Sequence, residues 1–513
     1  MLGLTTCVLL VPLWCVHSPA MPDYPAHIAG FYLIAGGAKT MPLATYYAIR
    51  WLLVPNLASE LIVPLLAKLS TVEIATKLFL SAALAMWVLG PAAIQRALFG
   101  RVGLAPLAGA FFAYNANFTW GFFNYYFATG FCFLLFAAWV ATAKRRSPYT
   151  LIGFALAVCA LYACHLVAVF LLATMIACFE TWLFWNERNL ELKKLASRAL
   201  SFFLVFLPVA IAFLFFKPEG TAGGQVAFDF SDTIGDRFGA AIQLYYSEPS
   251  YLLMSGLALL YLSGLMYGWL RIHASMKILV IVLCALTLVA PEWALGGWGV
   301  HLRLPGVLGA MLFATAELRL DWRLNALAAA VLLLVAGVSS AILTENWIGY
   351  DRQYSEFRAA LHDIPKGSKL MTVLDGDSLS YETDPIPDQP YWHMAEFAIV
   401  DRAAFTPLMF TTKGQHIVRV EPPYDQLAAG DAQQGSPPDV TELEDLAAGI
   451  DDNDPDIEGV FPYLKRFQCH FDIAVVIRGK GEASDVPEFL TLRYAGSFFS
   501  LYDIHPTKSC GKR

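Results

Sequence analysis

The sequence has few charged residues. Asp, Glu, Lys and Arg make up 15% of its 513 residues, whereas hydrophobic residues make up 57%. Soluble domains carry about 25% charged residues and roughly 45–50% apolar residues. This deficit of charge excludes an ordinary soluble globular chain and indicates a polytopic membrane protein.

Several chemical signatures are also missing. The sequence has no glycine-rich phosphate loop, no Cys/His zinc spacing and no Ser-His-Asp arrangement, so ATPase and hydrolase functions have little support. It has no basic stripe, and we therefore expect no nucleic-acid partner. It also lacks an internal repeat or a pair of matching broken helices, which many transporters possess.

The first apolar run lacks a basic start. Leu2–Val16 has no Lys or Arg before it, and the first basic residue of the chain is Lys39. A cleaved signal peptide has a basic start and a small-residue cleavage site. The sequence therefore favours an uncleaved first membrane span.

Further apolar runs predict ten more spans, since about 20 apolar residues cross a bilayer. Two spans fit between Arg101 and Lys144, with a turn in residues 115–124, and a hairpin fits between Arg146 and Arg188, with a turn near Tyr162–His165. The other predicted spans are Glu73–Ile94, Ala199–Phe216, Tyr251–Leu270, Ile278–Ala290, Gly306–Ala316 and Leu324–Leu343.

Basic residues give these eleven spans an orientation. If the N-terminus is cytoplasmic, all dense basic clusters fall in cytoplasmic loops, as the positive-inside rule requires. These clusters are Arg96/Arg101, Lys144–Arg146, Arg188–Arg198, Arg271/Lys277 and Arg319/Arg323. The sequence thus predicts a multi-pass membrane protein with a cytoplasmic N-terminus and its C-terminal domain outside the cytoplasm.

Charge also divides the chain. Residues 1–344 hold 20 Lys and Arg against 14 Asp and Glu, and residues 345–513 hold 15 against 28. We expect a transmembrane domain over 1–344 and a soluble domain over 345–513. The transmembrane domain would include a long first outer loop, 18–72, in which Tyr46–Leu53 and Leu57–Leu69 lie as helices in the membrane interface.

The soluble domain is predicted to be a small α/β or α+β domain. Short apolar runs are typical of strands, and helices are expected at Tyr354–Leu361 and Phe461–Phe467. The acidic region 421–458 has 12 Asp and Glu residues, which predicts a flexible segment or long loop. The predicted strands are Lys369–Leu374, Phe471–Ile477, Phe489–Arg493 and Phe498–Ile504.

Only two of the nine cysteines, Cys469 and Cys510, lie in the soluble part. Outside the cytoplasm they could form one disulfide, and two free thiols are the alternative. The other seven cysteines lie in apolar runs and are interpreted as packing residues.

The stretch Pro22-Asp23-Tyr24-Pro25-Ala26-His27 follows directly after the first apolar run. A carboxylate close to a bilayer is costly unless it is hydrated, paired or used. The two prolines predict a stiff turn that holds Asp23 and His27 at the membrane surface. A solvated loop aspartate is the alternative interpretation.

This layout resembles the GT-C class of polytopic membrane glycosyltransferases. The resemblance lies in an acidic residue in the first outer loop, here Asp23, in interfacial helices of that loop, and in an odd number of spans leading to an outer C-terminal domain. Runs that resemble uncharacterised bacterial proteins near this class are Pro55–Ala58, Gly121-Phe122-Phe123-Asn124-Tyr125 and Tyr391-Trp392-His393-Met394-Ala395-Glu396. A second acidic residue is frequent in the outer loops of the class, and Glu60 is one candidate here.

The resemblance implies transfer of a sugar from a polyprenyl-phosphate donor to a lipid or surface-glycan acceptor on the outer face. Asp23 would be the general base and His27 would orient it or share its proton. Arg303 would bind the donor phosphate, with His301 as a weaker candidate. A snorkelling Arg303, or an Arg303 paired with Glu292, is the alternative.

Two further residues are candidates for a site at the outer face. His165 lies at a predicted hairpin tip and Asn124 in the predicted turn of residues 115–124, although a turn-capping histidine is the simpler interpretation of His165. No metal site or cofactor is predicted. Asp229, Asp232 and Asp236 could bind a divalent cation or form a solvated acidic loop.

Two other functions stay open from the sequence. One is a lipid or glycan transporter or flippase, and the other is a non-catalytic membrane protein whose outer domain binds a ligand. Membrane lipids are expected partners in every case.

Overall fold

The structure, a computed structural model, describes residues 1–144, 146–186, 192–215, 234–244, 248–294, 298–375, 389–428, 437–449, 462–478, 485–506 and 510. The chain divides into two compact units. Unit 1 consists of Met1–Cys15, Leu53–Ser59 and Lys77–Glu345, and unit 2 of Val16–Leu52, Glu60–Thr76 and Asn346–Arg513. Most of the expected first outer loop, 18–72, thus groups with the C-terminal part of the chain.

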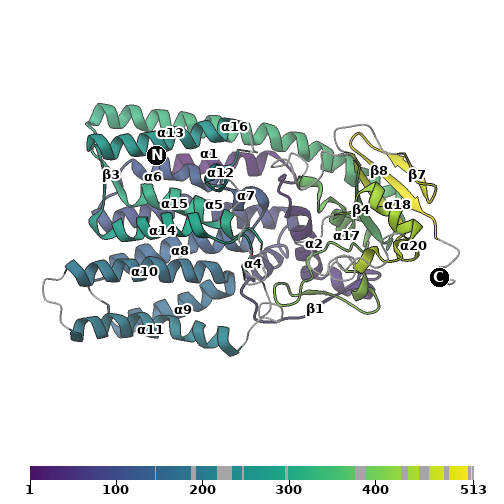
Figure 1. Ribbon diagram of the computed structural model, residues 1–513, viewed down its shortest axis with the longest axis horizontal. Coiled ribbons are helices and arrows are strands. Elements are labelled where there is room, and N and C mark those ends of the chain that lie inside the picture. Colours follow the sequence, from purple (N-terminus) through teal and green to yellow (C-terminus); the bar gives the residue numbers. More distant parts are fainter. Residues whose placement is uncertain are drawn as a thin grey trace. The chain divides into compact units, whose positions relative to one another are not determined.

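Unit 1 is helical. Helices α8 and α10, α9 and α11, and α14 and α15 pack against each other, and Figure 1 shows its long helices running side by side. Helix α5, Val72–Phe99, begins among unit 2 residues and continues into unit 1. Other helices in the described part of unit 1 are α1 (Leu2–Cys15), α6 (Ala105–Gly109), α7 (Ala116–Trp120), α8 (Phe123–Ala141), α9 (Pro148–Cys164), α10 (Leu166–Asn186), α11 (Leu192–Phe215), α12 (Ile234–Gly239), α13 (Glu248–Tyr267), α14 (Lys277–Val289) and α15 (Val300–Ala314).

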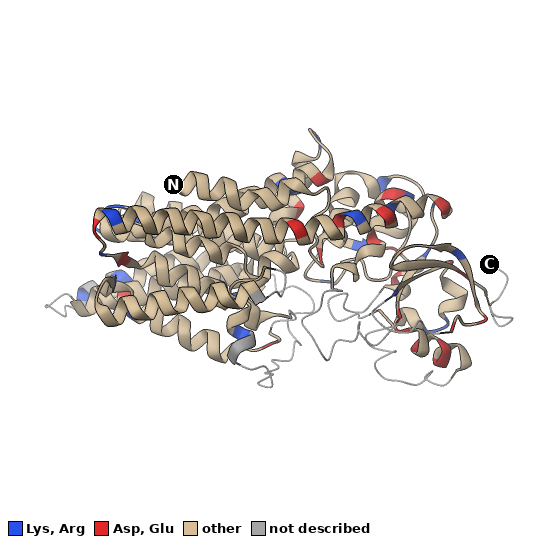
Figure 2. Ribbon diagram, turned by 90° about the horizontal axis from the view of Figure 1, so that it is seen from above, with Lys and Arg blue, Asp and Glu red and all other residues tan. Residues whose placement is uncertain are grey.

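Six helices in the described part of the chain are long and apolar enough to cross a membrane: α5, α8, α10, α11, α13 and α16 (Trp322–Ala360). Helices α1, α9, α14 and α15 are apolar but shorter. Large apolar side chains such as Leu252, Leu259 and Leu334 are exposed on these helices. Figure 2 shows few charged residues along the helices of unit 1. An exposed apolar surface of this kind is compatible with a lipid environment.

One predicted span is wrong. Residues 102–114 form the five-residue helix α6 and then a four-residue 3₁₀-helix, Ala110–Ala113, instead of a long helix. At about 1.5–2 Å per residue these turns cannot cross a hydrocarbon core of about 30 Å. The expected turn in 115–124 does exist, because Asn115 caps α7 through its side chain and Gly121 ends α7 with a φ of 97°.

The last predicted span continues further than expected. Helix α16 runs without a break over 39 residues and includes the helix expected at Tyr354–Leu361. It begins among unit 1 residues and ends among unit 2 residues.

A two-stranded antiparallel ladder joins two loops of unit 1. Strand β2, Leu270–Ile272, pairs with strand β3, Ala316–Leu318. The Gln95 side chain at the end of α5 donates to the Ala316 carbonyl at 2.7 Å, and Arg101 forms an ion pair with Glu317 at 2.6 Å. Three loops that carry basic residues therefore lie at the same end of unit 1.

Unit 2 is built on a four-stranded mixed sheet, in the order β4-β6-β8-β7. Strands β4 and β6 are parallel, and β8 is antiparallel to both β6 and β7. The strands are β4 (Leu370–Asp375), β6 (Ile473–Arg478), β7 (Leu490–Ala495) and β8 (Phe499–Ile504), which confirms the four predicted strands to within two residues at each start. Strand β6 is almost entirely buried, as expected for a strand covered on both faces.

Helix α2, Tyr24–Ala35, packs into the core of unit 2. Its Ala26, Ala29 and Leu33 share one buried cluster with sheet residues such as Met371 and Val476. Small side chains allow this close approach: a Cβ at position 30, where glycine stands, would lie 3.2 Å from the Met409 methyl group. The chain around Asp23 is therefore held by the C-terminal part of the sequence.

The expected interfacial helix at Tyr46–Leu53 is wrong. Only Leu43–Tyr46 is helical (α3), and Tyr47–Ile49 forms strand β1, which pairs with β5, Val418–Val420. The aromatic and β-branched side chains of this segment suit a strand, and its partner lies far along the chain. The piece Leu57–Leu69 does contain a helix, α4, Ala58–Leu66.

The acidic region 421–458 is only partly described. Its residues 437–449 contain helix α18, Val440–Ala448, with a capping box formed by Asp439 and Glu442. Expecting a loop throughout the region was therefore wrong, since the Asp-x-x-Glu spacing of a capping box was present in the sequence. Two further short helices in the described part of unit 2 are α17, Phe397–Arg402, and α20, Phe467–His470.

Cys469, in α20, forms a disulfide with Cys510. This decides between the two alternatives that the sequence left open. The helix expected at Phe461–Phe467 is replaced by a 3₁₀ turn, Pro462–Leu464, followed by α20.

Candidate functional site

Asp23 is the N-cap residue of α2. Its backbone carbonyl accepts from the His27 N–H at 3.0 Å, but its side chain makes no capping hydrogen bond. Pro25 stands in the first turn, where its missing N–H costs nothing. The Asp23 carboxylate is therefore not used to begin the helix.

The Asp23 side chain is partly buried, and its protein surroundings raise its pKa to about 7 because burial disfavours the charged form. The nearby His393 acts in the opposite direction, by a smaller amount. A carboxyl group with this pKa exchanges its proton near neutral pH, which is the property of a general base.

Three histidine rings surround Phe410 in unit 2. The ring centre of Phe410 lies 5.3 Å from that of His27, 4.8 Å from that of His393 and 5.2 Å from that of His416. The three histidines come from α2, from the turn after Tyr391 and from the segment before β5, and all are buried. Phe410 thus brings together titratable groups from separate parts of the sequence.

His393 has a carboxylate beside it. Its Nδ1 lies 3.8 Å from Oε1 of Glu396, which is 0% exposed. Burial by itself lowers the pKa of His393, but the Glu396 and Asp23 carboxylates raise it by more, so the pKa of His393 lies above its ordinary value. His416 behaves differently, because burial and the nearby Arg419 lower its pKa to about 3 and keep it neutral.

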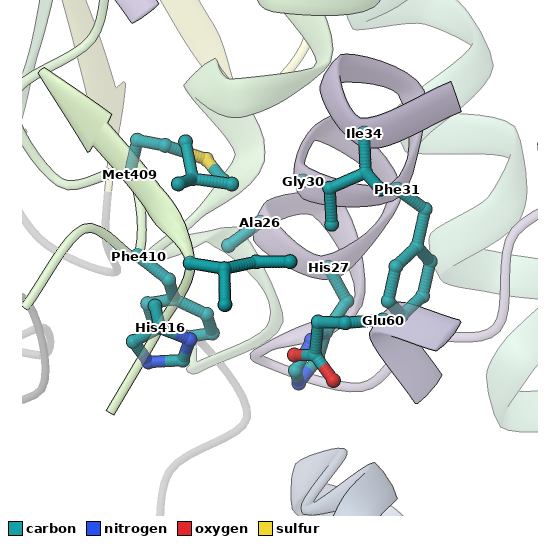
Figure 3. A pocket seen from close by; sticks show the side chains of 11 residues that line it. Ala26, His27, Gly30, Phe31, Ile34, Glu60, Met409, Phe410 and His416 are labelled. Atoms are coloured by element: carbon teal, nitrogen blue, oxygen red, sulfur yellow. The ribbon is translucent and has the colours of Figure 1, made fainter. Parts of the chain in front are cut away.

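A small cleft of about 260 Å³, part of which is open to solvent, lies between α2, α4 and the segment that leads into β5. Its lining is mostly apolar and includes Phe31 and Phe410, with His27, Glu60 and His416 as the polar members. Figure 3 shows the polar ends of His27 and Glu60 at one end of the cleft, with Gly30, Ile34 and Met409 toward the other. The buried Glu60 therefore lines the same cleft as His27, whereas Asp23 is not among the residues that line it.

Arg303 belongs to unit 1, in the first turn of α15. Its Nη2 donates to the Trp298 carbonyl at 3.2 Å, and its Cζ lies 5.5 Å from the ring centre of Phe122 and 5.4 Å from that of Tyr125. Its Nε is buried without a hydrogen bond, and Arg303 forms no ion pair with any residue that the structure describes. The alternative pairing with Glu292 is not found among the described residues, where Glu292 accepts a hydrogen bond from Trp298 Nε1.

His165 lies close to this guanidinium. Its ring centre is 5.3 Å from that of Tyr125, and its Nδ1 accepts from the Val167 N–H at 3.2 Å. Tyr125 donates its hydroxyl to the Arg303 carbonyl at 2.7 Å. The structure therefore brings Arg303 and His165 to the same aromatic ring, and His165 also serves as a turn cap.

The other two unit 1 candidates have structural contacts. The buried Asn124 accepts from the Ser59 N–H at 2.7 Å and donates to the Asn56 carbonyl at 2.9 Å, so it holds the segment 53–59. His301 is buried two residues before Arg303, and its ring centre lies 6.2 Å from that of Trp298.

No group of three His, Cys, Asp or Glu side chains within the described residues could hold a metal ion. Asp229 and Asp232 lie outside the described residues, as does the side chain of Asp236.

Sequence reasoning missed His393, Glu396 and His416 as site residues. The signal for the first two was present in Tyr391–Glu396, where a histidine and a glutamate three residues apart interrupt an aromatic and apolar run. Their proximity to Asp23 could not be read from the sequence, because it depends on the packing of α2 against the C-terminal part.

In comparisons with known proteins, no protein-family model and no curated protein matched the chain. The assignment of a function therefore rests on the residues and their geometry.

Proposed function

We propose that the protein is a polytopic membrane glycosyltransferase of the GT-C type. It would move a sugar from a polyprenyl-phosphate donor to a lipid or surface-glycan acceptor on the outer face of a bacterial inner membrane. The observation that carries the proposal is Asp23, a partly buried carboxyl group with a pKa of about 7 that follows closely after the apolar helix α1 in the chain.

Asp23 would act as the general base. It would accept the proton of an acceptor hydroxyl while that oxygen bonds to the anomeric carbon of the sugar and the bond from this carbon to the donor phosphate breaks. Direct displacement of this kind inverts the anomeric centre. His27, one helical turn after Asp23 on α2, and Glu60, on α4, both line the cleft. They are the proposed partners of the acceptor.

Arg303 would bind the phosphate of the polyprenyl donor. A guanidinium can pair with two phosphate oxygens through parallel hydrogen bonds. Two features support this role: the half-buried Arg303 has no carboxylate partner within the described residues, and the rings of Phe122 and Tyr125 hold it in place. His165 and His301 are secondary candidates at this end of unit 1.

The membrane arrangement belongs to the same proposal. We infer a multi-pass protein with a cytoplasmic N-terminus and a periplasmic C-terminal domain. The long apolar helices support membrane insertion, and the β2–β3 ladder supports a common side for the loops that carry Arg101, Arg271 and Arg319.

The proposal is tested with the full-length protein in lipid nanodiscs and a set of polyprenyl-phosphate sugars. Release of polyprenyl phosphate and formation of a glycosylated acceptor are measured by mass spectrometry. The wild type should release polyprenyl phosphate, and Asp23→Asn should lower the rate by about 10²- to 10⁴-fold, the usual contribution of a general base.

Asp363→Asn is the matched control, because Asp363 is an exposed aspartate of the same unit. It should keep the wild-type rate. A flippase would move the lipid-linked sugar across the bilayer without cleaving it, and a non-catalytic protein would do neither. Either result, or full activity in Asp23→Asn, would contradict the proposal.

A further inference from the structure

The Glu396 carboxylate is completely enclosed by protein. It is 0% exposed, and neither of its oxygens has a hydrogen-bond partner within the described residues. An ionised carboxylate without a partner is very costly in such a place. Its negative charge therefore needs a nearby positive charge, or the group must take up a proton.

The nearest group that can supply that charge is His393. Its Nδ1 is 3.8 Å from Glu396 Oε1, is equally buried, and has no hydrogen bond within the described residues. This distance is too long for a hydrogen bond but suits an electrostatic pair. Both residues stand in one short segment, since Glu396 ends the 3₁₀-helix Met394–Glu396 that follows His393.

Other titratable groups also stand around this pair. Helix α2 contributes Asp23 and His27, β1 contributes Tyr47, and the turn Pro462–Leu464 contributes Tyr463. The neighbouring helix α17 carries two charges that are already used, because Asp401 binds Arg358 and Arg402 donates to the Ile364 carbonyl. His416, on the far side of Phe410, stays neutral.

We infer that Glu396 is a positioning residue that acts through His393: its buried carboxylate, 3.8 Å from the His393 imidazole, favours the protonated imidazole, and this positive charge in turn favours the ionised form of Asp23. This inference deepens the proposed function, on which it rests for the role of Asp23 as the base.

The direction of each effect follows from charge. Burial raises the pKa of Asp23, and His393 lowers it when protonated. Without the Glu396 charge, less opposes the effect of burial, and the pKa of His393 falls. The positive charge near Asp23 is then smaller, so the pKa of Asp23 rises further and less of it is ionised.

The inference is tested by NMR on the full-length protein in nanodiscs with ¹⁵N-labelled histidine. The His393 signal is assigned by its loss in His393→Gln and is followed from pH 4 to 9. In the wild type its titration midpoint should lie above the ordinary value of about 6.5. In Glu396→Gln, which keeps the volume but removes the charge, the midpoint should fall by about one pH unit or more, a tenfold loss of proton affinity.

Asp23→Asn tests the second link, because electrostatic coupling is reciprocal. It should also lower the His393 midpoint, whereas Glu396→Asp should restore most of the loss seen in Glu396→Gln. Glu444→Gln, which removes an exposed carboxylate of the same unit, should leave the midpoint unchanged. A wild-type midpoint below 6.5, or no change in Glu396→Gln or Asp23→Asn, would overturn the inference.

The readout separates this inference from the proposed function. The histidine titration needs no substrate, so the coupling can be present in a protein that transfers no sugar, and that result would overturn only the proposed function. If the protein does transfer sugar, Glu396→Gln should shift the rise of activity to higher pH, and an unshifted pH profile would overturn only the inference.

Discussion

At the scale of single residues, Asp23 is held at some cost to stability. Its pKa is about 3.8 for an exposed aspartate and about 7 in the folded chain. The folded state therefore binds more protons than the unfolded state between these values, and the free energy of unfolding falls as the pH rises through this window. Functional groups often lower the stability of the fold that holds them.

Asp23→Asn should remove this penalty. We expect the variant to be more stable than the wild type at pH 8, by up to about 4 kcal/mol, and almost equal to it near pH 3, where the Asp23 carboxyl is mostly protonated in both states. Thermal unfolding of the purified protein at the two pH values measures the difference. A variant that is less stable than the wild type at pH 8 would contradict the pKa that we assign to Asp23.

At the scale of residues, the sequence could predict candidates near the first apolar run but not the contacts that distant segments make with them. Asp23, His27 and Glu60 were chosen because they stand near the first apolar run, and the structure places all three in unit 2, with His27 and Glu60 in one cleft. His393 and His416 join them only because Phe410 packs against all three imidazoles. A contact that depends on folding distant segments together leaves no local pattern in the sequence.

At the scale of elements, Glu180 in α10 holds three helices of unit 1 together. It accepts from Arg146 before α9 at 2.6 Å, from Arg198 in α11 at 2.7 Å and from Trp139 in α8 at 2.8 Å. The Glu180 and Arg146 side chains are only 11% exposed, so these charges are largely removed from water. Removing one member of such a buried group leaves the others unpaired.

Glu180→Gln should therefore lower the free energy of unfolding in detergent by about 3 kcal/mol. Glu317→Gln is the matched control, because Glu317 pairs with the well-exposed Arg101 and Arg319, and such pairs contribute about 0–1 kcal/mol. Equal losses of unfolding free energy in the two variants would contradict this account, because burial of the Glu180 network would then add nothing to stability.

Elements with a strong local signal were predictable. The four sheet strands were found because short apolar runs were bounded by polar and turn residues, and most long apolar runs became helices. Strand β1 was missed because its three residues are stable as a strand only beside Val418–Val420. Residues 102–114 were missed because an apolar run does not show where the chain bends.

At the scale of the whole molecule, the proposed membrane orientation predicts on which side of the membrane Lys144 and Arg513 lie. Alkaline phosphatase fused after Arg513 should be active, because the enzyme needs export, and a fusion after Lys144 should be inactive. The Cys469–Cys510 disulfide should also protect both thiols from maleimide until a reductant is added. An inactive fusion at Arg513, or free thiols at both positions, would contradict a periplasmic C-terminal domain.

The apolar composition predicted a helical membrane part, and the uneven charge together with short apolar runs predicted a separate strand-containing part. It could not predict that residues 16–52 fold with residues 346–513, since that grouping depends on the packing of α2 and β1 against the C-terminal sheet and its loops.

The central claim is that Asp23 is a base that works near neutral pH. The most direct measurement is the pH dependence of kcat/KM for release of polyprenyl phosphate by the wild-type protein, beside Asp23→Asn. The account predicts a tenfold rise per pH unit that levels off near pH 7, and almost no release by the variant. A rate that is constant between pH 5 and 9, or a variant as active as the wild type, would contradict it.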